Sequence, residues 1–350
     1  MEYHHIVTEN DSFYSNWNTH YFLNNNVITG IQMHHHPIEM MRMNNGFKNI
    51  TMNTFNCDTN TFTPNEELTF VDYENLKEIT HFFDYITYIY VFDTKNKQYS
   101  KTSEFPYLIS EIDGNYITSC RLNNLIYIFH SITWDYETGV FIFDIETNTF
   151  NNVDFTHLNK SDSSHENDYE CDYCDGCEKC EREIMPNYTN KFKNLHKMEI
   201  VDCTVHENDI IINFTDDNET TKICKYNPET DELIELLFVV PKATDQSHRE
   251  FPHKIKLNDG MLFGQNWYHK NNLLHFYDVD KKELIKKYAV CNENELIDFW
   301  SQQDKELIVI CHVFERVDIH KQIYKETHED EFKTRMLQIK KFNIDKILSE

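Results

Sequence analysis

A short unit of apolar runs and a polar turn recurs through most of the chain and constrains its fold more than any other feature. Its clearest copy spans Leu125–Phe150, where two apolar runs, LIYIF and VFIF, precede the polar turn DIETNT and a final Phe. Both runs are rich in β-branched and aromatic residues and are too short for helices, so they predict strands. Because neither run alternates apolar with polar residues, both faces of each strand should be buried.

The end of the unit defines the repeat: an aromatic residue, then Asp or Asn, then five residues and a large apolar residue. The Asp or Asn positions are Asn56, Asp93, Asp144, Asn227 and Asp278, with a shortened sixth copy at Asn343. The intervals are 37, 51, 83, 51 and 65 residues, and intervals near 50 are typical of a four-stranded propeller blade. The short polar side chain suits a turn, because it can bond its own backbone two residues on. The sequence therefore predicts an all-β fold, a β-propeller of six blades with four antiparallel strands each.

In these copies the sequence resembles a known repeat. The segments IYIF and VFIFDIETNTF are similar to the second to fourth strands of a kelch repeat, and YNPETDEL at Tyr226–Leu233 is similar to the same turn. The chain departs from the kelch pattern where a glycine pair usually follows the second strand, since it has His130-Ser131, Phe214-Thr215 and Gln265-Asn266 there. With 7 Gly in 350 residues, it resembles a degenerate kelch-like propeller that forms one domain over residues 1–350. An all-β repeat of another family is the alternative.

Charge and hydropathy limit the partners. The formal net charge is −26, from 59 acidic and 33 basic side chains, which argues against nucleic acid and against an anionic membrane surface. No apolar run approaches the ~20 residues of a membrane span. A solvated acidic surface that keeps the protein soluble is the first interpretation of this charge, and a protein partner with a basic patch is the other.

The cysteines and the N-terminus favour a reducing compartment. Residues 1–5 have neither the basic nor the apolar region of a secretory signal, so we expect a cytoplasmic protein, with a nuclear location also open. Six Cys are scattered singly in or beside the predicted strands and are expected to be reduced, buried small apolar residues. They are Cys57, Cys120, Cys203, Cys224, Cys291 and Cys311.

The other four Cys cluster in an acidic insertion at residues 155–196, in the segment CDYCDGCEKC. Thiolates at Cys171, Cys174, Cys177 and Cys180 can hold zinc or an iron–sulfur centre. Because only two residues separate the two CxxC pairs, three of these Cys with His165 or Cys203 form a geometrically easier site. The surrounding acids raise the thiol pKa values unless a metal is bound, and free thiols in an acidic loop are the alternative.

Loop lengths predict which face of the propeller carries the functional site. The links between first and second strands and between third and fourth strands are tight. The second-to-third links, such as 131–139 and 312–334, and the fourth-to-first links, such as 154–197, are long. Because antiparallel strands alternate in direction, all the long links should emerge on one face. Long loops on a rigid frame usually carry function, and the kelch resemblance implies partner binding at that face.

Aromatic residues in two of the long loops are the candidate anchors for a partner. Trp134, Tyr136, Trp267, Tyr268 and His269 could meet at the mouth of the disc, where Trp and Tyr often anchor interfaces. The alternative is that they cap the core locally. The sequence has no nucleophile elbow and no phosphate-binding glycine loop. We therefore expect a non-catalytic scaffold for protein–protein interaction, the alternative being a metal-dependent enzyme with its site at the central channel.

Overall fold

The structure, a computed structural model, describes most of the strands of the chain. The described residues are 2–6, 19–34, 49–59, 61–85, 88–102, 115–132, 137–151, 153–154, 187–188, 195, 198–216, 220–240, 252–258, 261–266, 273–292, 295–313 and 336–350. Over these residues, no helix has the length and apolar character that a membrane crossing requires.

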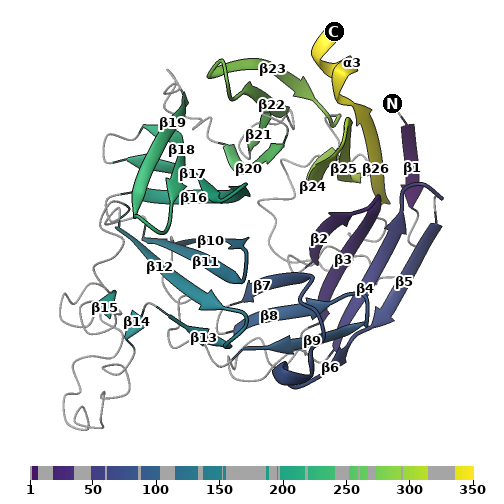
Figure 1. Ribbon diagram of the computed structural model, residues 1–350. Helices are drawn as coiled ribbons and strands as arrows, with labels where there is room; N and C mark the ends of the chain where they lie inside the picture. The colour runs from purple at the N-terminus through teal and green to yellow at the C-terminus, as the bar shows by residue number, and fades with distance from the viewer. Residues whose placement is uncertain are drawn as a thin grey trace, which may run out of the picture.

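Sheets arranged around a common centre give the chain a β-propeller arrangement (Figure 1). Five of them are complete antiparallel sheets of four strands, which confirms the predicted fold class. In pairing order these sheets are β2 (Thr19–Asn24), β3 (Val27–His34), β4 (Asn49–Asn56) and β5 (Thr61–Glu67); β10 (Asn115–Leu122), β11 (Leu125–Ile132), β12 (Glu137–Asp144) and β13 (Thr149–Phe150); β16 (Met198–His206), β17 (Asp209–Asp216), β18 (Thr221–Asn227) and β19 (Glu232–Val240); β20 (Pro252–Asn258), β21 (Met261–Asn266), β22 (Leu273–Asp278) and β23 (Glu283–Ala289); and β24 (Glu295–Gln303), β25 (Glu306–Val313), β26 (Met336–Asn343) and β1 (Glu2–Ile6). A separate two-stranded sheet pairs β14 (Val153–Asp154) with β15 (Asn187–Tyr188).

The second unit corrects the predicted count of six blades to five complete ones. Here β7 (His81–Tyr85), β8 (Tyr88–Asp93) and β9 (Gln98–Lys101) are antiparallel, but the outermost strand is β6 (Thr69–Phe70), which is two residues long and parallel to β9. The interval between the turn residues of the first two units is 37 residues, against 51 for the next interval. A 3-10 turn, η3 (Tyr73–Asn75), lies between β6 and β7.

The two ends of the chain close the ring together. The N-terminal strand β1 pairs antiparallel with β26 from Glu2 opposite Lys341 to Ile6 opposite Leu337, and it completes the sheet whose other three strands come from the C-terminus (Figure 1). After β26 the short helix α3 (Ile344–Ser349) begins, and the Asn343 side chain accepts a hydrogen bond from the Lys346 amide at 3.0 Å. The last copy of the repeat thus uses its polar residue to cap a helix instead of a hairpin.

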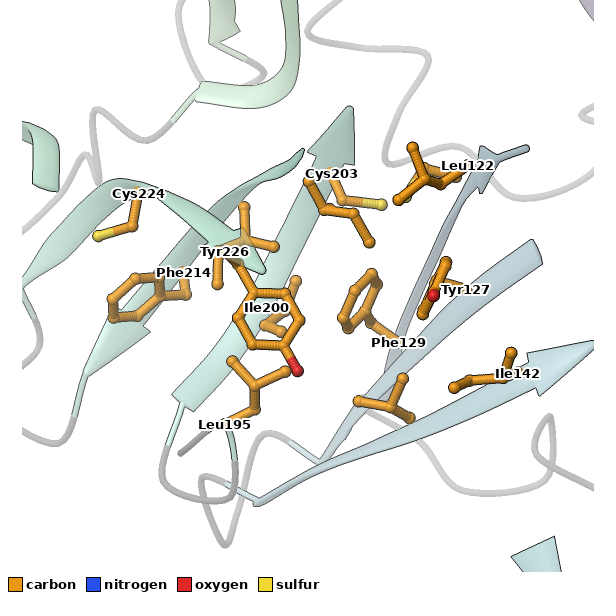
Figure 2. Close-up of a cluster of buried hydrophobic side chains, with 14 residues drawn as sticks. Leu122, Tyr127, Phe129, Ile142, Leu195, Ile200, Cys203, Phe214, Cys224 and Tyr226 are labelled. Carbon is orange, nitrogen blue, oxygen red and sulfur yellow. The ribbon is translucent and has the colours of Figure 1, made fainter. Parts of the chain in front are cut away.

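The core lies between neighbouring sheets, and strands of the clearest repeat contribute to it on both faces. Ile126 and Ile128 of β11 pack toward β8, whereas Tyr127 and Phe129 pack toward the sheet of β16 to β19. Figure 2 shows Phe129 pointing toward Ile200 from the adjoining sheet. All four β11 residues are 4% exposed or less, which confirms the predicted burial of both strand faces.

The repeated Asp or Asn makes the same turn in each complete copy, as predicted. The Asp144 side chain accepts a hydrogen bond from the Glu146 amide at 2.9 Å, and Asn227 accepts one from the Glu229 amide at 2.8 Å. The corresponding bonds from backbone amides two or three residues on are made to Asn56, Asp93 and Asp278. A local side-chain bond therefore holds each third-to-fourth link in a tight turn.

Backbone conformation confirms the tight hairpin turns on one face of the propeller. The non-glycine residues with positive φ among the described residues all lie in these hairpin turns: Asn25, Asn26, Lys97, Asn123, Asn148, Glu207, Asp231, Lys282 and Asp304. We call this side the tight-turn face. The strands that leave the opposite side lead into connections such as 7–18, 35–48, 133–136, 267–272 and 314–335, and we call that side the long-loop face.

Candidate functional site

The residues predicted to bind a partner all lie outside the described residues. Trp134 and Tyr136 belong to the connection between β11 and β12, and Trp267, Tyr268 and His269 belong to the one between β21 and β22. The strand ends on either side place both connections on the long-loop face. Whether these side chains meet there stays a prediction.

The predicted metal ligands of the insertion, Cys171, Cys174, Cys177 and Cys180, also lie outside the described residues. Within the described part of the chain, the structure instead brings together a different set of potential ligands. The sulfur atoms of Cys291 and Cys311 and a carboxylate oxygen of Glu295 lie within 4.8 Å of one another, and all three residues are buried. This Cys-Cys-Glu group is the candidate metal site, which we call the closing-blade cluster after the sheet that contains Glu295 and Cys311.

For two of the six scattered cysteines the sequence prediction of isolated thiols is wrong. The Cys291 and Cys311 sulfurs are in contact and joined as a disulfide, across Cα atoms 7.1 Å apart. Hairpin register could have signalled this, because Cys311 lies opposite Ile297 near the start of β24, and Cys291 lies a few residues before that strand. In the sequence each of these two Cys has the pattern of an isolated apolar position, because the sequence alone does not show which residues pair across the hairpin.

The other four scattered cysteines confirm the prediction, since Cys57, Cys120, Cys203 and Cys224 are free and buried. Burial raises the pKa of the Cys57 and Cys224 thiols to about 11. Burial also raises the pKa of Cys203, and the neighbouring Cys120 thiol adds to that effect. Thiols with raised pKa values are poor nucleophiles and poor ligands at neutral pH.

A buried ion pair adjoins the closing-blade cluster. The Lys340 ammonium on β26 donates to Glu295 Oε2 and, at 3.2 Å, to the Val290 carbonyl. The Glu295 carboxylate also accepts from the Asn292 amide nitrogen at 2.7 Å and from its side-chain nitrogen at 3.3 Å. Lys340 and Glu295 are 2% and 7% exposed, so the two charges compensate each other in the interior.

Gln338 is a further buried polar residue on the sheet face that carries Cys311. It lies directly opposite Cys311 in the β25–β26 register, so the two side chains share one face of the sheet. Gln338 is 5% exposed, and its Oε1 atom has no hydrogen-bond donor. The sequence alone did not predict that Glu295, Gln338 and Lys340 belong to a site. Isolated polar residues in apolar strands form no recognisable pattern until the strand register brings them together.

The cluster lies just beneath the long-loop face. Glu295 begins β24, Cys311 lies near the end of β25 and Gln338 lies near the start of β26, and these three strand ends belong to the long-loop side. The same sheet face packs on Leu274 and Phe276 of β22. The cluster is therefore enclosed between two neighbouring sheets.

Near the centre of the ring, the Asp202 carboxylate on an inner strand makes structural bonds. Asp202 of β16 accepts from the Thr118 hydroxyl of β10 at 3.1 Å and from the Ile255 amide of β20 at 2.5 Å. One carboxylate thus joins three consecutive blades. Such a bridging role gives no support to the alternative of a metal-dependent enzyme with its site at the central channel.

A pocket of about 800 Å³ lies on the tight-turn side, between the η3 segment and the turn after β12. Its walls include Tyr73, Lys77 and Arg121. The Tyr73 hydroxyl donates to the Ile145 carbonyl at 2.7 Å, and Arg121 donates to the Ile79 carbonyl at 2.7 Å. Burial raises the pKa of Tyr73 to about 12, with a smaller contribution from Asp144. These polar groups join neighbouring blades, and we assign the pocket no ligand.

No family model and no curated protein matches the sequence. Solved structures that are similar include a hydrazine synthase from Kuenenia stuttgartiensis, with 6% identity, a TM-score of 0.34, and coverage of 84% of this chain and 56% of that one. A complex of KlAtg21 with the coiled-coil of AgAtg16 is 10% identical, with a TM-score of 0.37 and coverage of 83% and 78%. TolB from Acinetobacter baumannii is 8% identical, with a TM-score of 0.38 and coverage of 83% and 60%. The chain therefore spans less than two thirds of the hydrazine synthase and TolB chains.

Proposed function

We propose that this chain is a non-catalytic, kelch-like scaffold of the cytoplasm that binds another protein through its long-loop face. The observation that supports this proposal is the difference between the two faces. The tight-turn face consists mostly of short hairpin turns held by local side-chain bonds, with the η3 segment and α3 also on that side. Most of the long connections leave from the other side, and long loops on a rigid frame are typical of a binding module.

The composition defines the partner that this face would bind. With a net charge of −26, the chain favours a partner that offers Lys or Arg, because complementary charge accelerates association. Trp134 and Trp267 are the proposed anchors, with Tyr136, Tyr268 and His269 beside them, since buried aromatic residues carry most of the energy of an interface.

The test is the binding of single variants to a partner recovered by affinity purification and identified by mass spectrometry. Trp134→Ala and Trp267→Ala should each weaken binding by about 2 kcal/mol or more if they are anchors. Phe70→Ala is the matched control, because Phe70 is an aromatic side chain that is 49% exposed on the outermost strand of its sheet. Thr230→Ala controls for the tight-turn face, where Thr230 is exposed.

Added salt should slow association with the partner more than it speeds dissociation, because screening acts on the long-range attraction. The proposal is wrong if Phe70→Ala or Thr230→Ala weakens binding while both tryptophan variants bind normally. Asn123 and Asp304 are unsuitable as controls for that face, because both have positive φ, and Ala there would disturb the turn itself.

We also propose zinc as the ligand of the insertion, held by Cys171, Cys174, Cys177 and Cys180. The spacing of the four thiols supports this, since thiolates are the ligands zinc prefers in structural sites. Replacing Cys174 and Cys177 by Ser should lower the zinc content by about one per chain, measured by elemental analysis of protein purified without chelator. Cys57→Ser and Cys224→Ser, at buried free thiols, should leave the zinc content unchanged.

A further inference from the structure

The closing-blade cluster has the donor set of a metal site as well as that of a disulfide. Two sulfurs and a carboxylate oxygen lie within 4.8 Å of one another in a buried position. The Cα atoms of Cys291 and Cys311 are 7.1 Å apart, just beyond the ~6.8 Å upper end of the usual disulfide range. Two thiolates on one tetrahedral zinc lie roughly 3.8 Å apart, given Zn–S bonds of about 2.3 Å. The backbone spacing therefore favours sulfurs separated by a shared ion.

A side-chain oxygen on the sheet face that carries Cys311 lacks a hydrogen-bond donor. Gln338 Oε1 is buried without a donor, and its residue is directly opposite Cys311. Buried carbonyl oxygens without partners are rare, because desolvation of such an atom is costly. With the Cys291 and Cys311 sulfurs and a Glu295 oxygen, Gln338 Oε1 supplies a fourth ligand atom, the number that a structural zinc site uses.

The charges around the cluster balance once an ion is bound. Two thiolates and the Glu295 carboxylate carry three negative charges, whereas a divalent cation and the Lys340 ammonium carry three positive ones. Lys340 is already held against Glu295 in the interior. These five groups together carry no net charge, and buried ions are tolerated when they are paired in this way.

We propose that the closing-blade cluster, in its reduced form, is a binding site for a zinc-type divalent cation with Cys291, Cys311, Glu295 and Gln338 as ligands. A dithiol reductant first gives two electrons and two protons to the disulfide, which yields two thiols and leaves the reductant oxidised. The cation then displaces one proton from each thiol as the two metal–sulfur bonds form. The ion would join the segment before β24 to β25 and β26, and so lock the sheet in which the two chain ends meet. This site is independent of the proposed partner binding.

The experiment uses the full chain with Cys171, Cys174, Cys177 and Cys180 replaced by Ser, so that the insertion contributes no thiolate. Purified with a non-thiol reductant and without chelator, this protein should carry about one zinc per chain by elemental analysis. Titration of the zinc-free protein with Co²⁺ should produce the absorption bands of a tetrahedral site with thiolate ligands. In the same background, Cys311→Ser should weaken Co²⁺ binding at least tenfold, and Gln338→Leu should weaken it while the thiolate bands remain.

Cys57→Ser is the matched control, because Cys57 is a free cysteine as buried as Cys291, at 3% and 7% exposed. It should leave both zinc content and the Co²⁺ spectrum unchanged. Oxidation of the protein before titration should abolish binding, because a disulfide offers no thiolate. The proposal is overturned if the reduced background protein holds no zinc and gives no Co²⁺ bands. It is equally overturned if the oxidised protein or the Cys311→Ser variant binds Co²⁺ as well as the parent does.

Discussion

The buried ion pair of Lys340 and Glu295 leads to the sharpest stability prediction. Lys340→Met removes the ammonium but keeps the aliphatic length of the side chain, so it leaves the Glu295 carboxylate buried without its counter-charge. Removing one partner of a buried pair typically costs 3–5 kcal/mol. We expect a loss of about 3 kcal/mol, the lower end, because Glu295 keeps its two bonds from Asn292, at 2.7 and 3.3 Å.

A second substitution separates charge from packing. In Lys340→Met with Glu295→Gln neither residue of the pair carries a charge, and the Gln side chain can still accept from the Asn292 amide. Neutral replacement of both partners of a buried pair is often nearly neutral in stability. The double variant should therefore recover at least about 1 kcal/mol relative to Lys340→Met, as a positive coupling in a double-mutant cycle.

Urea unfolding at pH 7, with chelator and reductant present, measures these free energies without any contribution from bound metal. Lys305→Met is the matched control, since Lys305 pairs with Asp345 at 2.6 Å but the two side chains are 74% and 62% exposed. Its unfolding curve should overlay that of the wild type, because exposed pairs contribute little. If Lys340→Met unfolds no earlier than Lys305→Met, or if the double variant is no more stable than Lys340→Met, the interior pair does not stabilise the fold as argued.

Three further predictions follow from other parts of the fold. Asp144→Ala should cost about 1 kcal/mol of unfolding free energy through the lost turn bonds. Asp144→Asn should cost almost nothing, because Asn56 and Asn227 make the same turn. Urea curves that rank the two variants in the opposite order would contradict this account. Burial, assisted by the Arg121 charge, lowers the pKa of His81 to about 4. The unfolded chain therefore binds more protons, and stability should fall as the pH decreases from about 6.5 toward 4. His81→Phe, which can keep the stacking on Phe22, should weaken that pH dependence in thermal melts, and an unchanged dependence would assign it to other groups. Deleting residues 161–186 should leave the melting temperature nearly unchanged, because closing a loop of different length costs little entropy, and a large drop would show that the insertion is structural.

The sequence by itself determined the parts of this protein that local physical chemistry controls. The apolar runs of β11 and β12 specified strands buried on both faces, because β-branched and aromatic side chains fit a pleated, two-sided core. Asp144 and its counterparts specified the tight turns, since the bond from each side chain goes to a backbone amide only two or three residues away. The all-β class and the difference between the two faces both follow from such local signals.

Only the tertiary structure decided which distant segments meet. The pairing of β1 with β26 depends on ring closure between the two ends of the chain, and no periodicity encodes it. The number of complete antiparallel blades is five because the outermost strand of the second sheet, β6, pairs with β9 in parallel. This strand precedes the other three strands of its sheet in the chain. The cluster of Cys291, Glu295 and Cys311 likewise depends on register across a hairpin, where each residue alone has the appearance of an ordinary buried position. Contacts of this kind are set by the packing of whole sheets, and a single sequence does not show which distant residues are in contact.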